Sequence, residues 1–244
     1  MTAALVIRDL AAGERAAVAA WLPAGSDTAP PAPGDAWLAA APEGGAPRAV
    51  LRLQCAIGLD LPRPWYHVGC VVHAAPALQL FHRLHTLQLG NDHTGVSELA
   101  GIAWDRTLSL PEQAQALQAL VGGALARIAA RPGDFAPRLI VELPGVRDAN
   151  GASPFWQGLG RHFYRGDPQA AAERLGPAWR CHVAPLLPRQ PVYTAFLPDA
   201  AREAIAQVHP AARVLVEVLW QAGFRYGHHV TVDDGGPVFE RALD

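Results

Sequence analysis

One long helix with well-marked ends constrains the fold of this 244-residue chain more than any other segment. Ser109 can accept from an amide of the first turn, Glu112 can reach back to the Ser109 amide, and Pro111 suits the start of a helix. Apolar residues then recur at helical spacing, and a Pro-Gly pair ends the pattern at 132–133. The sequence therefore predicts a helix over residues 109–130 with one buried face.

The segments around this helix alternate between strand and helix patterns. Apolar runs predict strands at residues 5–7, 37–41, 49–57, 99–104, 139–143, 179–187 and 224–232. Further helices are predicted over residues 11–22, 199–208 and 211–222, with a short one after Ser153. Residues 59–91 have mixed periodicity and predict no element. The order indicates an α/β fold: a mixed sheet with helices on both faces, in one domain over residues 1–244, with a proline-rich surface loop at 23–34.

The composition excludes several classes of function. The formal net charge of −2 provides no field that would attract nucleic acid or an anionic membrane. All 20 basic residues are arginine, which excludes a Schiff-base lysine and a P-loop lysine. The three cysteines lack Cys-x-x-Cys spacing and are typical of reduced thiols in a cytosolic protein. With no signal-peptide pattern and no apolar run of membrane length, the chain is expected to be soluble and cytoplasmic.

Six short motifs follow one another along the chain. They are PWY at 64–66, NDHTGVSEL at 91–99, SPFW at 153–156, LPRQPVY at 187–193, QVHP at 207–210 and DDGGP at 233–237. With these motifs the chain resembles the arginine N-succinyltransferase family, which belongs to the GNAT-like acyltransferases. The resemblance implies a GNAT-like fold and transfer of succinyl from succinyl-CoA to the α-amine of L-arginine in arginine catabolism. It also implies succinyl-CoA as a co-substrate and no permanently bound cofactor. From the composition, no nucleic-acid or membrane partner is expected.

His209 is the candidate catalytic residue. It lies between two predicted helices and immediately before Pro210, which disfavours the α conformation for it. Histidine has an unperturbed pKa near neutrality, which suits proton transfer. Taken alone, the position also fits a histidine that caps the C-terminus of the preceding helix. The resemblance favours the first alternative, because His209 matches the family's proton-donor histidine.

Residues 91–102 form the candidate substrate side of the site. Asn91 and Asp92 belong to a polar stretch that is typical of a structured turn before a strand. Alternatively, Asn91, Asp92 and Glu98 bind substrate, because a carboxylate pairs directionally with the guanidinium group of arginine. Ile102 matches the position at which the family contacts succinyl-CoA, and it is equally typical of an ordinary residue in a buried strand.

The histidines are not expected to bind a metal. His82 and His85 are three residues apart and could share a helix face, but the sequence offers no further ligand at a suitable spacing beside them. His228 and His229 would point to opposite faces of a strand. The sequence therefore predicts no metal site.

One region departs from the pattern of catalytic family members, which carry a basic, glycine-rich loop for the CoA pyrophosphate before the long helix. Residues 105–113 contain no glycine, and Glu112 places a negative charge at the helix start. The family's Tyr-Arg pair is missing after Tyr66, and the family's C-terminal extension is expected to be absent. A non-catalytic homologous subunit or pseudoenzyme is therefore the alternative function. A homo-oligomer and pairing with a homologous subunit both remain open.

Overall fold

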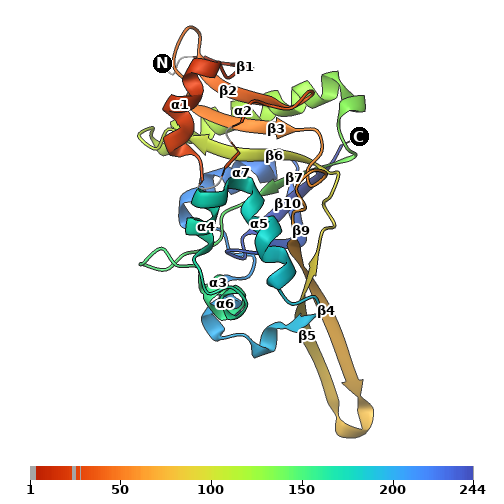
Figure 1. The fold of residues 1–244 in the computed structure, drawn as a ribbon. Helices are drawn as coiled ribbons and strands as arrows, with labels where there is room; N and C mark the ends of the chain where they lie inside the picture. The colour runs from red at the N-terminus through yellow and green to blue at the C-terminus, as the bar shows by residue number, and fades with distance from the viewer. Residues whose placement is uncertain (1–3, 24–25, 28, 244) are drawn as a thin grey trace.

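The fold is built on one continuous sheet. The computed structural model describes residues 4–23, 26–27 and 29–243. Within them, ten strands are hydrogen-bonded in the order β1-β2-β3-β6-β7-β10-β9-β4-β5-β8. Neighbouring strands are antiparallel except for β6 and β7, which run parallel. Figure 1 shows this sheet with the helices around it, so the predicted α/β fold with a mixed sheet is confirmed.

The elements have well-defined bounds. The strands are β1 Leu5–Asp9, β2 Ala36–Pro42, β3 Ala49–Gln54, β4 Trp65–Ala75, β5 Leu80–Gly90, β6 Ser97–Trp104, β7 Arg138–Glu142, β8 Val192–Tyr193, β9 Arg225–Thr231 and β10 Pro237–Ala242. The α-helices are α1 Arg15–Val18, α2 Leu110–Ala130, α3 Pro154–Gly158, α4 Pro168–Leu175, α5 Trp179–Val183, α6 Asp199–Ala204 and α7 Arg213–Gln221. Short 3₁₀ helices are η1 Ala12–Glu14, η2 Ala19–Trp21, η3 Pro76–Leu78, η4 Pro132–Asp134, η5 Gly160–His162, η6 Gly176–Ala178, η7 Ala184–Leu186, η8 Thr194–Phe196 and η9 Pro210–Ala212.

Two helices, α2 and α7, cover one face of the sheet and bury the largest core. Leu117, Leu120 and Leu219 of these helices pack against alternate residues of β2 and β3, such as Leu38 and Leu51. Gly123 permits the closest approach of α2 to β1, since a Cβ atom there would lie only 2.6 Å from the Ile7 side chain. The helix predicted over residues 109–130 is thus confirmed as α2, and its apolar face is the buried one.

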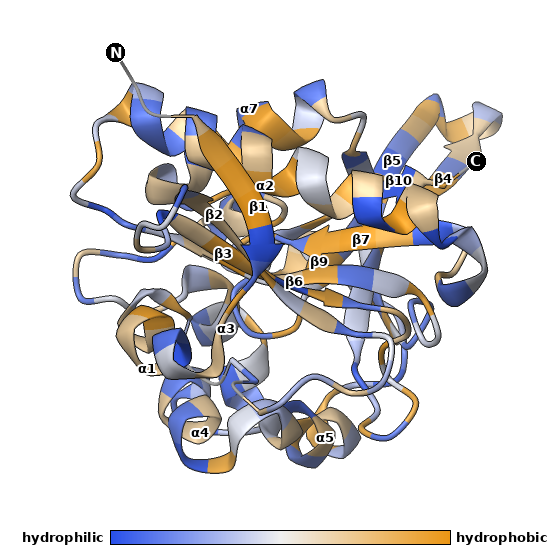
Figure 2. Cartoon of the chain, turned by 90° about the horizontal axis from the view of Figure 1, so that it is seen from above, coloured by the Kyte–Doolittle hydropathy of each residue, from blue (hydrophilic) through white to orange (hydrophobic). Residues whose placement is uncertain are grey.

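The remaining helices lie on the other side of the sheet, as Figure 2 shows for α1, α4 and α5. Val18 of α1 packs on Trp37 and Ala39, which point away from α2. A second large core joins the α3–α6 region to β4, β5 and β9, with Tyr66 and Trp156 at its centre. Within the described part of the chain, none of the helices has both the length and the hydrophobicity that crossing a membrane requires.

The β4–β5 hairpin is the largest part of the fold that the sequence did not predict. It occupies most of residues 59–91, and its 11-residue strands pair along their full length. Gln79, at φ 52°, turns the chain after η3. The hairpin extends well beyond the rest of the sheet (Figure 1).

Three sequence-based assignments need correction. The strand predicted over residues 179–187 is wrong: this segment forms α5 and η7, and its buried residues Trp179, Val183 and Leu187 recur every four positions, which is a helical period. The helix predicted over residues 199–208 ends at Ala204, because Ala206 adopts a left-handed backbone (φ 59°). The last strand is β10 and not β9, so residues 232–236 connect two paired strands.

Candidate active site

Among the described strands, β6 and β7 are the parallel pair, and the sheet opens between them. β6 and β7 pair at Ser97–Leu139 and Glu98–Ile140, near their amino ends, and the described residues show no further pairing between them. Farther along β6, Gly101 and Ile102 form a bulge against β3, with Gly101 at φ 55°. Bulges redirect side chains next to binding sites, and open α/β sheets bind ligands beyond the carboxyl ends of their parallel strands. This opening is therefore the candidate site.

His209 lies at the carboxyl end of β7. Its backbone N–H donates to the Pro144 carbonyl at 2.8 Å, and Val208 forms a β-bridge with Gly145. The Nδ1 atom of His209 accepts from the Ala211 amide at 3.2 Å and so caps η9, the entry to α7. The alternative in which His209 caps the preceding helix is thus wrong. Because Nδ1 accepts, the neutral ring carries its proton on Nε2.

The start of α2 is satisfied by its own residues. The Glu112 carboxylate accepts from the Ser109 amide at 3.0 Å and from the Ser109 hydroxyl at 2.7 Å. These bonds, with a smaller contribution from Arg48, lower the pKa of Glu112. Before the helix, the amides of residues 105, 107 and 108 donate to other protein acceptors. A phosphate group would have few free backbone donors here.

Arg106 lies beside this opening, at the end of β6. Its guanidinium carbon lies 4.2 Å from the centre of the Trp104 ring, and its Nη1 donates to the Ala211 carbonyl at 3.3 Å. It therefore connects the end of β6 to η9, which precedes α7. An arginine stacked in this way is well placed to contact an anion.

The loop before β6 is a structured turn that is tied to β9. The Thr94 amide donates to the Asn91 carbonyl at 2.9 Å, and both Asn91 and Asp92 are exposed. A carboxylate oxygen of Asp92 lies 3.0 Å from Nε2 of His229. The other ring nitrogen of His229 lies 2.8 Å from the Gly227 carbonyl oxygen. Each ring nitrogen of His229 therefore faces an oxygen acceptor.

His93, in the same loop, is fully buried beneath this pair. Its ring packs edge-on against Trp65 and His229, with centroid distances of 5.0 and 4.3 Å. Burial, together with the charge on His229, lowers the pKa of His93 to about 4. His93 is therefore neutral near pH 7 and belongs to the packing of the loop.

Glu98 is already paired with a guanidinium group of its own chain. Arg63 bonds Glu98 at 2.5 Å and Glu142 at 2.8 Å. Arg180 bonds Glu142 at 2.9 Å and Asp233 at 3.1 Å. We call these five residues the charged cluster. The Trp65 indole also donates to Glu142, at 2.6 Å.

The charged cluster contains three carboxylates and two guanidinium groups, and it is largely buried. Burial acts against ionisation, but Arg180 and Arg63 lower the pKa of Glu142 to about 2. For Asp233, burial outweighs the attraction of Arg180 and raises the pKa to about 6, with Asp234 and Glu142 adding to the shift. The charged cluster has one more carboxylate than it has guanidinium groups, and Asp233 is the carboxylate whose ionisation is least favoured there.

One row of paired residues across β7, β10 and β9 places Glu142 and His229 on the same face of the sheet. Glu142 is the register partner of Val238, and Val238 is the partner of His229. Register partners share a face, and neighbouring strands are about 4.8 Å apart, so Glu142 and His229 are separated by about 10 Å. Glu142 stands two residues before Pro144, which holds His209, while His229 holds Asp92.

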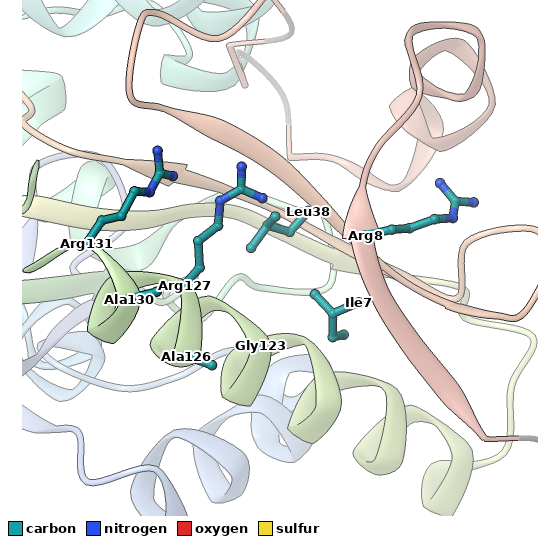
Figure 3. Close-up of a pocket in the computed structure, with 8 residues that line it drawn as sticks. All are labelled: Ile7, Arg8, Leu38, Gly123, Ala126, Arg127, Ala130 and Arg131. Atoms are coloured by element: carbon teal, nitrogen blue, oxygen red, sulfur yellow. The ribbon is translucent and has the colours of Figure 1, made fainter.

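Two hollows lie outside this opening. One, of about 480 Å³, lies between β1 and the second half of α2 (Figure 3). Its rim arginines Arg8, Arg127 and Arg131 are each paired with a carboxylate. The other, of about 580 Å³, follows β7 and is lined by polar residues that include Ser153, which caps α3 by accepting from the Trp156 amide. The first hollow is at the far end of α2 from Glu112.

Comparison with known proteins agrees with this architecture. Residues 41–244 match the family model described as "Arginine N-succinyltransferase beta subunit". The chain belongs to this family. The arginine N-succinyltransferases of Salmonella arizonae, Salmonella paratyphi B and Salmonella newport are each 36% identical to it over 195 residues, which is 80% of this chain and 56% of theirs. The chain spans little more than half the length of these relatives.

A solved member of the same group has the same fold. It is arginine/ornithine succinyltransferase subunit AI from Pseudomonas aeruginosa, with a TM-score of 0.79 and 25% sequence identity. The match covers 99% of this chain and 77% of that chain. The family resemblance inferred from the six motifs is therefore confirmed, together with the fold that it implied.

Within this arginine N-succinyltransferase fold, the residues singled out from the sequence occupy three places. His209 and Ile102 lie toward the carboxyl ends of the parallel strands. Asn91 and Asp92 lie in the loop tied to β9, and Glu98 lies in the charged cluster. His82 and His85 are on β5, opposite His73 and Cys70, and not on a helix.

Sequence reasoning missed Arg63, Glu142, Arg180 and His229. Glu142 carried a usable signal, because a carboxylate at the end of an otherwise apolar buried strand requires a partner. Arg180 was obscured by the incorrect strand assignment over residues 179–187. His229 gave no signal, since its partner Asp92 is 137 positions away.

Proposed function

We propose that this chain transfers the succinyl group of succinyl-CoA to the α-amine of L-arginine, as the names of its relatives imply for them. The observation that carries the proposal is the placement of His209. The Pro144 carbonyl and the Ala211 amide fix its backbone and its Nδ1 atom beside the opening between β6 and β7. A ring held in this way presents Nε2–H in one direction, as a proton donor requires.

The reaction would proceed by attack of the neutral amine on the thioester carbonyl. The C–N bond forms, the C–S bond breaks, and the proton lost by the amine is balanced by one gained by the departing thiolate. His209 would donate that proton to the thiolate from Nε2. Ile102, in the bulge of β6, would contact the acyl end of succinyl-CoA.

The amine side of the site would be the 91–98 segment. Asn91 and Asp92 are exposed and would meet the cationic substrate, for which the Asp92 carboxylate is the directional partner. Glu98, which is buried and bound by Arg63, would contribute to the negative potential behind them. Arg106 would supply the positive charge for CoA phosphates that the α2 amides do not.

The test is release of free thiol when purified protein is mixed with succinyl-CoA and L-arginine. Thiol release that is faster with L-arginine than without any amine supports the proposal. Repeating the assay with L-ornithine, glycine and L-arginine methyl ester shows whether the guanidinium group, the side chain and the carboxylate of the substrate are required. No release from the chain alone, with release after a second homologous subunit is added, would assign it to a paired enzyme. No release under either condition would favour the non-catalytic alternative. We place this activity in the cytoplasm.

A further inference from the structure

Three segments of the chain are joined beyond the carboxyl end of β7. The turn between β9 and β10 contacts the residues after β7, because the Leu143 amide donates to the Pro237 carbonyl at 3.0 Å. The same turn contacts the segment before His209, since the Ala206 amide donates to the Gly235 carbonyl at 2.8 Å. His209 is in turn hydrogen-bonded to the residues after β7. The turn is therefore held next to the segment that carries His209.

The two carboxylates of this turn, Asp233 and Asp234, have different surroundings. Asp234 is buried and accepts from the Thr231 hydroxyl at 2.7 Å and from the Gly236 amide at 3.0 Å, so it shapes the turn. The Asp233 side chain is 18% exposed. Among the described residues, Arg180 is the one side chain that donates to it, at 3.1 Å. Because a carboxylate can accept several hydrogen bonds, Asp233 has room for a further donor.

The other two carboxylates of the charged cluster already accept several hydrogen bonds. Glu142 accepts from Arg180 and Trp65 and pairs with Arg63. Glu98 has a side chain only 2% exposed, and both terminal nitrogens of Arg63 bond it, at 2.5 and 3.0 Å. These contacts use both guanidinium groups of the cluster. The remaining carboxylate is therefore the one that can receive a cationic group from outside the chain.

The ionisation of Asp233 suits proton transfer near neutral pH. Burial raises its pKa to about 6, against the attraction of Arg180, and the charges of Asp234 and Glu142 add to the shift. Arg147 faces Asp234 at 3.8 Å and offsets part of that charge. Asp233 is thus mostly ionised at pH 7. A base transfers protons most efficiently when its pKa is close to the working pH.

Building on the proposed function, we propose that Asp233 is the catalytic base: its carboxylate binds the α-ammonium group of L-arginine and takes one proton from it. An N–H bond of the ammonium breaks, an O–H bond forms on Asp233, and the electron pair left on nitrogen attacks the thioester carbonyl. The second proton that the nitrogen loses balances the one that His209 donates to the thiolate. Asp233 returns its proton to water, so each turnover releases one proton. Asp92 remains for the guanidinium group.

The pH dependence of thiol release by Asp233→Asn tests the proposal. Asparagine keeps an oxygen for Arg180 but cannot take a proton. At pH 7 the variant should release thiol about 100-fold more slowly than the wild type, within the range for loss of a general base. Its rate should rise about tenfold per pH unit as more of the substrate amine becomes neutral in solution. The wild-type rate should be level above pH 7 and fall below about pH 6.

A less basic amine provides a second measurement. The α-amine of L-argininamide ionises like that of a peptide, at about pH 7.7–8.0, so the loss caused by Asp233→Asn at pH 7 should shrink to about tenfold. Asp199→Asn is the matched control, because the Asp199 side chain is 81% exposed and lies on α6. It should leave the rates and their pH dependence unchanged.

The outcomes separate this proposal from the proposed function. An active wild type with an Asp233→Asn variant that is unimpaired, or equally impaired at every pH and with both amines, would overturn the role of Asp233 alone. A wild type that releases no thiol with L-arginine, either alone or with a second homologous subunit, would overturn the proposed function and the role of Asp233 together.

Discussion

The start of α2 and the charged cluster both hold a carboxylate beside arginine, but they do so in opposite ways. Glu112 is partly exposed and receives both of its hydrogen bonds from Ser109, three positions away. Glu142 is nearly buried and is bonded by Arg180 and Trp65, which are 38 and 77 positions away. The first arrangement is local and the second joins distant parts of the chain.

Because one pair is exposed and the other is buried, we expect substitutions in the two regions to change the stability of the fold by different amounts. An exposed pair is screened by water and contributes little to stability, so the start of α2 can change without loss of the fold. Removing one member of a buried pair leaves an uncompensated charge, which destabilises a protein by about 3–5 kcal/mol. Residues at the start of α2, on the CoA side of the proposed site, can therefore be substituted without loss of the fold. Substitution of Glu142 or its partners is expected to destabilise it.

The largest effect is expected at His209, which stands between the two regions. His209→Ala should lower turnover by about 10²–10⁴-fold, the range for loss of a general acid or base. Thiol release from succinyl-CoA measures it. His209→Asn separates proton transfer from capping, because asparagine also caps helices well. Full activity in either variant would remove His209 from the mechanism.

Glu142→Ala should reduce the free energy of unfolding by about 3–5 kcal/mol, because Arg180 and Arg63 would remain buried without their shared carboxylate. Urea titration measures the change. The matched control is Glu240→Ala, since Glu240 pairs with Arg138 at 3.3 Å on a half-exposed site and should contribute at most about 1 kcal/mol. An equal decrease in the free energy of unfolding for the two variants would contradict the expected difference between buried and exposed pairs.

Asp233→Asn should change stability in a pH-dependent way. The folded-state pKa of about 6 exceeds the unfolded value of about 3.9, so this carboxyl stabilises the fold below pH 4 and that stabilisation is lost as pH rises through about 6. Relative to wild type, the variant should gain up to about 3 kcal/mol between pH 4 and pH 7.5. Urea titrations at both pH values measure this gain. Asp199→Asn, at an exposed site, should show no such gain, and a pH-independent difference for Asp233→Asn would contradict the prediction.

The smallest effect is expected at Glu112. Succinyl-CoA should bind the chain with a Kd poorer than about 0.1 mM, near the weak end of typical enzyme constants. Glu112→Gln should improve binding by about two- to fivefold, because it removes one negative charge from the positive end of the helix dipole. Calorimetric titration measures both, with Glu173→Gln as a charge-matched control. Micromolar binding by the wild type would show that other groups, such as Arg106, replace the missing loop.

Much of the fold could be predicted from the sequence because its signals are local. The β2–β3 hairpin, α2 with Ser109 and Glu112, and the cap of α3 by Ser153 each depend on residues a few positions apart. The strand predicted over residues 179–187 failed because a short, mostly apolar segment fits a strand and a buried helix equally well. For the site, the motifs singled out His209 as the candidate catalytic residue, and its capping of η9 followed only from the structure.

The sequence by itself determined the family, the mixed α/β sheet and the satisfied start of α2. The tertiary structure alone decided that Glu98 would be paired with Arg63, that His229 would hold Asp92, and that the outer half of the β4–β5 hairpin would stand free of the sheet. The physical reason is separation along the chain. A cap or a turn requires particular residues at fixed short spacing, whereas a side-chain pair closed by folding across 35 or 137 positions leaves no periodic pattern in either partner's neighbourhood.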